Sequence, residues 1–516
     1  MGSTIRALLA VSPEIAATAQ IYGDPDTAIS GLAYDSRQVT PGTLFAAWQG
    51  AAFDGHRFIA GALDRGAVAL LAERPIDDPR ARCTVVVRNS RAALAQLAAS
   101  FYHDPSLELG LIGVTGTKGK TTTSFLIEAL LGQQFQTGLI GTVDLKVGPQ
   151  RWRNPIHQTT PEALDVQRML REMVEAEVAW GILETSSHAL ATFRVDRCAY
   201  DIAVITNVTH EHLDFHGTYD QYLAAKATLF DRLATPGVKP SLLAHRGTVI
   251  NRDDPGAATI IGRARGVREL TYGLSPEATI RATDLHVGGD GLRFTLTSPW
   301  GTVPIRTPLL GRFNVYNALA AAGATLLADL PLARIAEGLA AFGGVPGRVQ
   351  RIDAGQPFLV VVDFAHNADS LEQILILLRG VTRGRLIAVF GSAGERDVAK
   401  RGMMGAICAR LADFGIFTDE DPRGEDPLAI IQAIAAGTAS AGWREGHEYL
   451  SITDRRAAIA RAFTLAQPGD VVLLAGKGHE NSIVYADGAI PWDEATEARL
   501  ALARLGYGKS NGDEQD

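Results

Sequence analysis

Hydrophobic residues along this chain fall into short apolar runs that alternate with stretches of helical spacing. Up to about Pro105 the apolar runs are TLFAAW, AVALLAE and CTVVVRN, and one helical stretch reads RAALAQLAASFY. Further runs are LELGLIGVTG, AWGILET, YDIAVITNV, FLVVVDF, RLIAVFG, FGIFTDE and DVVLLAG. Strands that alternate with helices predict mainly parallel sheets covered on both faces. We therefore expect an α/β protein.

We expect three domains, because 516 residues are several times the usual length of one domain. Residues 1–105 predict a small N-terminal α/β domain, residues 106–343 a central domain with a mainly parallel sheet, and residues 344–507 a Rossmann-like α/β domain. Short alternating strands around residues 268–310 predict an antiparallel edge. The tail 508–516 lacks apolar side chains and predicts disorder.

Composition narrows the class of protein. A net charge of -8 gives no basic footprint for nucleic acid. The cysteines, Cys83, Cys198 and Cys408, lie far apart without a CxxC pair, as in a reducing compartment. No apolar run approaches the ~20 residues that cross a bilayer, and the start MGSTIRALLAVSPEI is unlike a signal peptide. We expect a cytoplasmic monomer without nucleic-acid or membrane partners.

The stretch GVTGTKGKTTT, Gly113 to Thr123, lies between an apolar strand and a helix. Glycines let the backbone curl so that several N–H groups point at one anion, and the helix dipole adds to the attraction. Lys120 can neutralise phosphate charge, and the Thr121 hydroxyl can bind Mg²⁺. The common phosphate loop has glycine six residues before its lysine, where this chain has Val114. The loop is thus a variant, and it predicts binding of a nucleoside triphosphate.

Acids and histidines follow the next two apolar runs. Glu184 ends the run AWGILET, and the stretch NVTHEHLDFHGTYDQYLAAKATLF contains Lys226. Since the ends of parallel strands meet at one sheet edge, Glu184 is expected near a Mg²⁺ held by Thr121 and phosphates. Four histidines cluster in these two stretches: His188, His210, His212 and His216. Their clustering beside the phosphate loop favours a functional role, above all for His212.

These residues together resemble the Mur ligase family, ATP-dependent enzymes that form amide bonds in peptidoglycan precursor synthesis. The resemblance covers nearly the whole chain in order, including YDSRQVTPGTLFAAWQG, DGHRFI, GRFNVYNALAA, VVDFAHNADS and AGKGHE. Within the family the chain is most similar to the E type, which adds the third stem-peptide residue to UDP-N-acetylmuramoyl-L-alanyl-D-glutamate. The resemblance implies domains that bind, in order, the UDP-sugar, ATP and the incoming amino acid.

The resemblance also implies roles for single residues. The implied ATP contacts are Gly116, Thr117, Gly119, Lys120, Thr121, Thr122, Asn317, Arg348 and Asp363. The implied contacts of the UDP-sugar and its dipeptide are Ser36, Thr159, Thr160, Ser186 and Arg194. The implied amino-acid contacts are Arg396, Glu420, Asp421, Pro422, Arg423, Gly476 and Glu480. The implied catalytic residues are Lys120, Glu184, His212 and Lys226. Two Mg²⁺ ions are implied, one bound by Thr121 and Glu184 and one by His212 and a carbamate of Lys226.

The loop TDEDPRGEDP, Thr418 to Pro427, bears on which amino acid is added. Family members that add meso-diaminopimelate have DNPR here, and their arginine binds the distal carboxylate. This chain keeps Arg423 but has Asp421 in place of asparagine. An acid would repel a second carboxylate and favour an ammonium, so L-lysine and L-ornithine stay open beside diaminopimelate, which we favour.

Three other functions stay open. An F-type ligase and a folylpolyglutamate synthase would share the ATP site, but AGKGHE with DPR argues against both, and YDSRQVTPG argues against the second. A nucleotide-binding homologue without ligase activity is opposed by the presence of Glu184, His212 and Lys226. The resemblance implies that the dipeptide carboxylate attacks ATP to give an acyl phosphate, which the amine of the amino acid then attacks.

Overall fold

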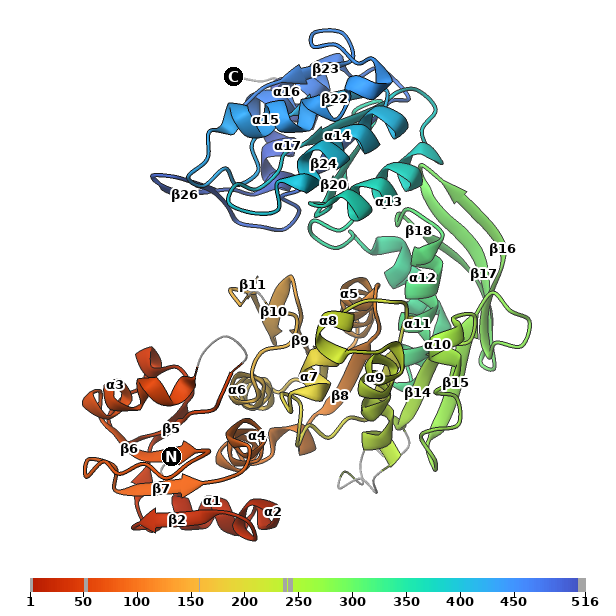
Figure 1. The fold of residues 1–516 in the computed structure, drawn as a ribbon. Coiled ribbons are helices and arrows are strands. Elements are labelled where there is room, and N and C mark those ends of the chain that lie inside the picture. The colour runs from red at the N-terminus through yellow and green to blue at the C-terminus, as the bar shows by residue number, and fades with distance from the viewer. Residues whose placement is uncertain (1–2, 51–53, 157, 235–238, 240–244, 509–516) are drawn as a thin grey trace, which may run out of the picture. The chain divides into compact units, whose positions relative to one another are not determined.

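The computed structural model describes residues 3–50, 54–156, 158–234, 239 and 245–508 (Figure 1). The chain divides into two compact units, each described by itself below. The first unit comprises Met1–Thr283, Thr295–Pro304 and Tyr316–Leu339, and the second comprises Asp284–Phe294, Ile305–Val315 and Ala340–Asp516. The tail for which we predict disorder lies outside the described residues, apart from Gly508.

The N-terminal part of the first unit is a sheet covered on both faces. Its strands, in spatial order, are β2 (Gln20–Gly23), β7 (Cys83–Val86), β6 (Ala67–Ala72), β5 (Thr43–Ala46) and β4 (Gly31–Ala33). Its helices are α1 (Ile5–Ala10), α2 (Pro13–Ala16), α3 (Ile59–Asp64) and α4 (Ser90–Phe101), and β1 (Ser3–Thr4) pairs with β3 (Ala28–Ile29). Neighbouring strands are parallel except β2 and β7. Alternate strand residues face opposite ways, so Leu44 packs with α4 and Phe45 packs with α3.

A second sheet of mainly parallel strands follows. Its strands, in spatial order, are β11 (Gln150–Arg153), β10 (Asp144–Val147), β9 (Thr137–Ile140), β12 (Trp180–Glu184), β8 (Gly110–Thr115), β13 (Ile202–Ile205), β14 (Gly247–Asn251), β15 (Arg268–Gly273), β16 (Ile280–Gly288), β17 (Gly291–Ser298) and β18 (Gly301–Thr307). Neighbours from β9 to β16 are parallel, whereas β10 is antiparallel to β9 and β11. The division between units passes through β16, β17 and β18.

The predicted antiparallel edge at residues 268–310 is partly wrong. β15 is parallel to both β14 and β16. The neighbouring strands β17 and β18 are joined by only two residues, Pro299 and Trp300, a connection that only antiparallel strands allow. The alternating pattern therefore identified the hairpin but not the direction of the strand before it.

Helices pack on this second sheet, and the loops after three of its parallel strands meet at one edge. The helices are α5 (Lys120–Leu131), α6 (Ala163–Glu175), α7 (Ser187–Ala191), α8 (Leu213–His216), α9 (Tyr219–Ala234), α10 (Pro255–Ala258), α11 (Phe313–Leu327) and α12 (Leu332–Ala341). Helices α6 and α9 bury Met169, Tyr222 and Phe230 in one apolar cluster with residues of β8 and β13. The loops that follow the parallel strands β8, β12 and β13 lie at the same edge.

The second unit contains a six-stranded sheet among its described residues. The strands, in spatial order, are β19 (Gln350–Ile352), β20 (Leu359–Asp363), β24 (Val471–Ala475), β21 (Leu386–Phe390), β22 (Phe414–Phe417) and β23 (Tyr449–Ser451). Only β19 among them runs antiparallel to its neighbour. A separate hairpin joins β25 (Ser482–Tyr485) and β26 (Gly488–Pro491).

Helices cover both faces of this sheet. Those on one face are α13 (Ala368–Arg379), α14 (Ala399–Leu411) and α15 (Pro427–Ala436); those on the other are α16 (Arg455–Leu465) and α17 (Glu494–Arg504). The α/β fold predicted from the apolar runs is confirmed. Within the described part of the chain, no helix has the length and apolar character that a membrane span requires.

Candidate active site

The glycine-rich loop connects β8 to α5, as its sequence predicts. Gly116 has φ 141° and Gly119 has φ 87°, a left-handed region that favours glycine. A Cβ on Gly116 would lie 1.9 Å from the Thr206 hydroxyl oxygen, and one on Gly119 would lie 2.4 Å from the Asn317 side-chain oxygen. Backbone conformation and close packing therefore both require glycine, and the loop leads directly into the N-terminus of a helix, where anions bind.

Two lysine side chains converge on this loop. Lys120 Nζ donates to the carbonyls of Gly116 (3.0 Å) and Thr117 (2.8 Å), and Lys226 Nζ donates to the same Gly116 carbonyl (2.7 Å). Lys226 is only 1% exposed, and its Nζ lies 4.3 Å from the centre of the Tyr222 ring. Burial, with the nearby charge of Lys120, lowers the pKa of Lys226 well below its usual value. The site thus holds one lysine at the loop and a second, buried one behind it.

Glu184 ends β12 beside the first turn of α5. Its carboxylate accepts hydrogen bonds from the Thr121 hydroxyl (3.0 Å), the Thr142 hydroxyl (2.9 Å) and the Thr142 N–H (3.1 Å). Burial raises the pKa of the Glu184 carboxyl, and the Thr142 N–H and Lys120 oppose this effect. A hydroxyl and a carboxylate side by side are hard oxygen donors that suit Mg²⁺.

The donor set fits Mg²⁺ better than a transition metal. Among the residues that the structure describes, no group of three or more His, Cys, Asp or Glu could hold a metal ion. Mg²⁺ is usually bound by one or two protein oxygens together with phosphates and water. Thr121 and Glu184 could supply those two oxygens.

Three of the clustered histidines lie together, His188 in α7, His212 just before α8 and His216 at the end of α8. The His188 ring lies 4.8 Å from that of His212 and 5.4 Å from that of His216, centre to centre. Burial and the charges of these two neighbours lower the pKa of His188 to about 4. The His212 side chain is 44% exposed, whereas His216 is buried and its Nε2 lies 3.1 Å from the Ser187 hydroxyl. His212 is therefore the more accessible of the two to a ligand.

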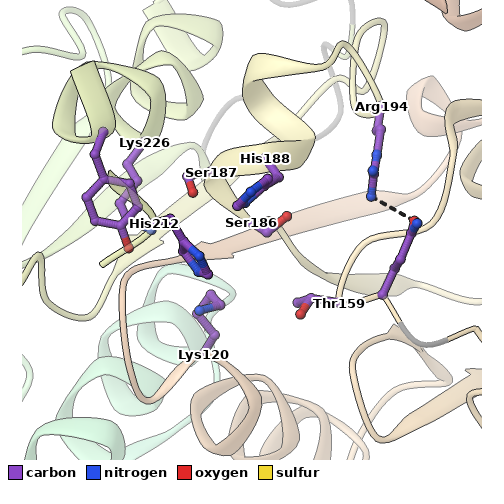
Figure 2. A pocket seen from close by; sticks show the side chains of 10 residues that line it. Lys120, Thr159, Ser186, Ser187, His188, Arg194, His212 and Lys226 are labelled. Atoms are coloured by element: carbon purple, nitrogen blue, oxygen red, sulfur yellow. Dashed lines mark hydrogen bonds between the residues drawn. The ribbon is translucent and has the colours of Figure 1, made fainter. Parts of the chain in front are cut away.

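A pocket of about 320 Å³ brings the predicted residues together (Figure 2). It is lined by Lys120, Gln158, Thr159, Ser186, Ser187, His188, Arg194, His212, Tyr222 and Lys226. Figure 2 shows Lys120, His212 and Lys226 on one side and Thr159 and Arg194 on the other. Predicted residues of the phosphate loop and of the dipeptide site thus line a single pocket.

Contacts within the protein hold the Thr160 side chain, and its role toward the dipeptide stays a prediction. It is fully buried; its hydroxyl donates to the Glu184 carbonyl (2.7 Å) and accepts from the Ser186 N–H (3.1 Å). Arg194 donates to Gln158 Oε1 (2.8 Å) and to the Thr160 carbonyl (2.9 Å). Thr160 therefore joins the segments that carry Thr159, Glu184 and Ser186.

A second pocket, of about 530 Å³, lies in the same unit and contains Ser36. It is lined by Tyr34, Asp35, Ser36, Arg37, Ala46, Ala47, Trp48, Gly50, Gly55, Phe58, Ile156, Gln158 and Glu162. Gln158 lines both pockets, so they adjoin at this side chain. Sequence reasoning missed Gln158, although it stands next to the QTTPE threonines.

Arg348 and Asp363, predicted to contact ATP, belong to the second unit. Asp363 ends β20 and accepts hydrogen bonds from the N–H groups of Val349 (2.7 Å) and Ala365 (2.9 Å). The Arg348 guanidinium carbon lies 5.0 Å from the centre of the Phe364 ring. These contacts hold both residues at one end of the sheet, and their role toward ATP stays a prediction.

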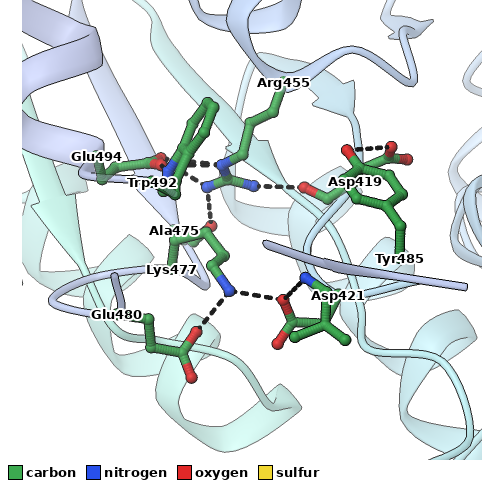
Figure 3. A network of polar contacts seen from close by, with 10 residues as sticks. Asp419, Asp421, Arg455, Ala475, Lys477, Glu480, Tyr485, Trp492 and Glu494 are labelled. Atoms are coloured by element: carbon green, nitrogen blue, oxygen red, sulfur yellow. Dashed lines mark hydrogen bonds and ion pairs between the residues drawn. The ribbon is translucent and has the colours of Figure 1, made fainter. Parts of the chain in front are cut away.

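The second unit brings together most of the residues predicted to bind the amino acid. Glu420 is 5% exposed, and a Cβ on Gly476 would lie 3.4 Å from its Oε2. Asp421 is bound by Lys477, which sequence reasoning missed although it stands within AGKGHE (Figure 3). Asp421 is thus a paired acid rather than a free one. Arg396 is exposed on the segment between β21 and α14.

Comparison with known proteins supports the same assignment. Three family models match in chain order: "Mur ligase family, catalytic domain" at residues 28–102, "Mur ligase middle domain" at residues 114–325, and "Mur ligase, glutamate ligase domain" at residues 347–478. A UDP-N-acetylmuramyl-tripeptide synthetase from Roseiflexus sp. (strain RS-1) is 50% identical over 486 residues, covering 93% of this chain and 96% of that protein. The chain belongs to the Mur ligase family.

Other Mur ligases are also similar over nearly their full length. The UDP-N-acetylmuramoyl-L-alanyl-D-glutamate–2,6-diaminopimelate ligase of Geobacillus thermodenitrificans (strain NG80-2) is 44% identical over 483 residues, covering 93% of this chain and 96% of that protein. A solved structure of a ligase with the same name is 31% identical, with a TM-score of 0.69, and covers 98% of this chain and 100% of the other. The predicted family and fold are confirmed for this Mur ligase.

Proposed function

We propose that this Mur ligase adds meso-diaminopimelate to UDP-N-acetylmuramoyl-L-alanyl-D-glutamate, with ATP as the co-substrate. The observation that carries the proposal is the pair of adjoining pockets that share Gln158. A long substrate could place its uridine end in the apolar pocket beside Ser36 and its peptide carboxylate beside Lys120. The names of the Geobacillus relative and of the similar solved structure support the choice of diaminopimelate.

The side chains suit the transfer of phosphate to a carboxylate. Attack of the peptide carboxylate on the γ-phosphate of ATP brings two anions together, and electrostatic stabilisation is the main contribution that an enzyme makes to such a step. Lys120, at the start of α5, is placed to offset the phosphate charge, and the amides of the glycine loop can bind phosphate oxygens. We propose that Arg194 and Thr159, which line the same pocket, orient the peptide.

Metal ions complete this proposal. Mg²⁺ bound by Thr121 and Glu184 would neutralise part of the charge on the phosphates. We propose that His212 and Lys226 hold a second ion, with Lys226 as its carbamate. Both residues line the same pocket as Lys120, and a carbamate would turn the buried amine into an anionic oxygen donor.

The second step needs a bound amino acid. The amine attacks the carbonyl carbon of the acyl phosphate, a C–N bond forms, phosphate leaves with the electrons of the C–O bond, and the nitrogen loses a proton to the departing phosphate or to water. We propose that Arg423 binds the distal carboxylate of the amino acid and that Glu480 binds its distal ammonium. The Nε of Arg423 is buried without a hydrogen-bond partner among the described residues, so the guanidinium retains capacity to bind a ligand.

Phosphate release by the purified chain tests this function. The assay supplies ATP, Mg²⁺ and UDP-N-acetylmuramoyl-L-alanyl-D-glutamate with meso-diaminopimelate, L-lysine or L-ornithine in turn. We expect release that requires the UDP-substrate and is fastest with diaminopimelate. Release that does not depend on the UDP-substrate would refute the ligase function, and a preference for lysine or ornithine would refute the choice of amino acid.

A further inference from the structure

Lys477 lies between two carboxylates in the second unit (Figure 3). Its Nζ is 2.8 Å from Asp421 Oδ1 and 2.8 Å from Glu480 Oε2. The Lys477 side chain is 1% exposed, that of Asp421 is 13% exposed and that of Glu480 is 33% exposed. One buried ammonium is thus shared by a largely buried acid and by an acid that a ligand can reach.

Asp421 is also tied to the backbone of β25. Its Oδ1 accepts a hydrogen bond from the Val484 N–H (2.9 Å), and the Arg423 N–H donates to the Val484 carbonyl (2.9 Å). Asp421 Oδ1 therefore accepts hydrogen bonds from both Lys477 and the Val484 N–H, which leaves this oxygen little capacity to bind a substrate amine.

We propose that Asp421 and Lys477 together set the charge of the amino-acid subsite. This charge decides whether the subsite prefers an amino acid whose distal end carries both an ammonium and a carboxylate, or one whose distal end carries an ammonium alone. The inference rests on the proposed function. The two carboxylates and one ammonium of Asp421, Lys477 and Glu480 carry one net negative charge. Lys477 would otherwise neutralise Glu480 completely, and Asp421 prevents this, so Glu480 retains negative charge for the substrate ammonium.

The sign of each perturbation follows from this balance. Removing the Asp421 charge leaves the group neutral, and L-lysine, whose distal end is cationic, loses more than diaminopimelate, whose distal end is neutral overall. Removing the Lys477 charge makes the group more negative and favours L-lysine. A unit charge about 7 Å away, at an effective dielectric between that of a protein surface and that of water, changes a preference by roughly three- to fiftyfold.

The experiment measures the ratio of kcat/KM for diaminopimelate to kcat/KM for L-lysine in four proteins: wild type, Asp421→Asn, Lys477→Met and the double variant. Both substrates are measured on the same sample, so the ratio does not depend on how much of a variant is folded. We expect the ratio to rise at least threefold in Asp421→Asn, to fall at least threefold in Lys477→Met, and to return near the wild-type value in the double variant, whose net charge is unchanged.

Matched controls carry the same charge changes elsewhere in the unit. Glu372 and Arg410 form a surface ion pair on α13 and α14, with side chains 35% and 56% exposed. Glu372→Gln and Arg410→Met should leave the ratio unchanged. If they move it as the test variants do, net protein charge rather than this group is responsible, and the inference is refuted.

The other outcomes separate the inference from two alternatives. If Asp421 bound the substrate amine directly, the double variant would keep the ratio of Asp421→Asn, and the inference would be wrong. If the ion pair only held the loop in shape, both single variants would lower kcat/KM for both substrates without opposite shifts, which would also refute it. A wild type without turnover on either amino acid would instead refute the proposed function, and the inference with it.

Discussion

Replacement of Arg455 by methionine should destabilise the second unit strongly. Arg455 and Glu494 form an ion pair with both side chains 0% exposed, and the shortest contact, Nη2 to Oε1, is 2.6 Å (Figure 3). Arg455 also donates to the carbonyls of Asp419 (2.9 Å) and Ala475 (2.7 Å). It therefore joins the start of the loop that carries Arg423 to the end of β24.

The size of the effect follows from what Arg455→Met leaves behind. Glu494 would lose its hydrogen bonds from Arg455 and would stay a buried charge. Of the hydrogen bonds that its side chain now accepts, only the one from the Trp492 Nε1–H (2.6 Å) would remain. Breaking a buried ion pair in this way costs about 3–5 kcal/mol. In a unit of this size that corresponds to a fall in Tm of roughly 6–20 °C. Replacing both partners, in Arg455→Met with Glu494→Leu, removes the unpaired charge, so most of the loss should be recovered.

Calorimetric unfolding of the single and double variants measures these differences in the transition of the second unit. Arg410→Met serves as the control, because an exposed ion pair contributes only about 0–1 kcal/mol. A double variant that is less stable than Arg455→Met would contradict the reasoning, since the damage would then come from lost packing and not from an unpaired charge.

Further predictions concern binding and catalysis. Gly116→Ala should weaken ATP binding at least tenfold in calorimetry, because its Cβ would lie 1.9 Å from a hydroxyl, whereas Gly61→Ala, with no atom within 4 Å, should not; equal affinities would contradict the loop geometry. Lys226→Ala should lose most ligase activity and regain part of it with short carboxylic acids, and full activity without them would refute the carbamate. Arg423→Ala should raise the KM of the amino acid about tenfold or more while the KM of ATP stays unchanged, and a large loss of ATP affinity would place the loop in the wrong site.

The apolar runs predicted many of the buried strands, because each run is bounded by polar or glycine residues. The phosphate loop was predictable for a local reason: strand, glycines, lysine and helix are contiguous in the chain, from Gly110 to Leu131. The direction of the strands at the sheet edge was not predictable, since β15 has an alternating pattern but pairs in parallel with both neighbours. Pairing direction depends on the path of the connecting chain, which a pattern of alternate residues does not contain.

Side-chain partners were the least predictable part of the site. The sequence did not show that the Thr160 hydroxyl bonds to the Glu184 backbone 24 residues away. Gln158 was missed although it precedes the threonines of QTTPE, because its position between two pockets arises from their three-dimensional arrangement. Sequence motifs identified which segments meet, whereas packing decides which atoms face the ligand.

The acidic loop illustrates why local charge is a poor guide to substrate charge. Its five acids would repel a carboxylate if all were free, yet most of them contact other parts of the same unit. Tyr485 donates to Asp419, Lys477 pairs with Asp421, Arg401 pairs with Glu425, and Asp426 caps α15. Burial raises the pKa of Glu420 and so favours its uncharged form.

The loop and its neighbour Glu480 thus present two charged groups to a ligand, one cation and one partly neutralised anion. Arg423 supplies the cation, and Glu480 shares Lys477 with Asp421. A distal end that carries both an ammonium and a carboxylate matches this pair, while a distal ammonium alone leaves Arg423 without a partner. A charged group brought near a ligand without a counter-charge loses hydration that is not replaced. If Arg423 and Glu480 bind the amino acid as proposed, this loop suits diaminopimelate better than lysine, although its composition, taken alone, argued the other way.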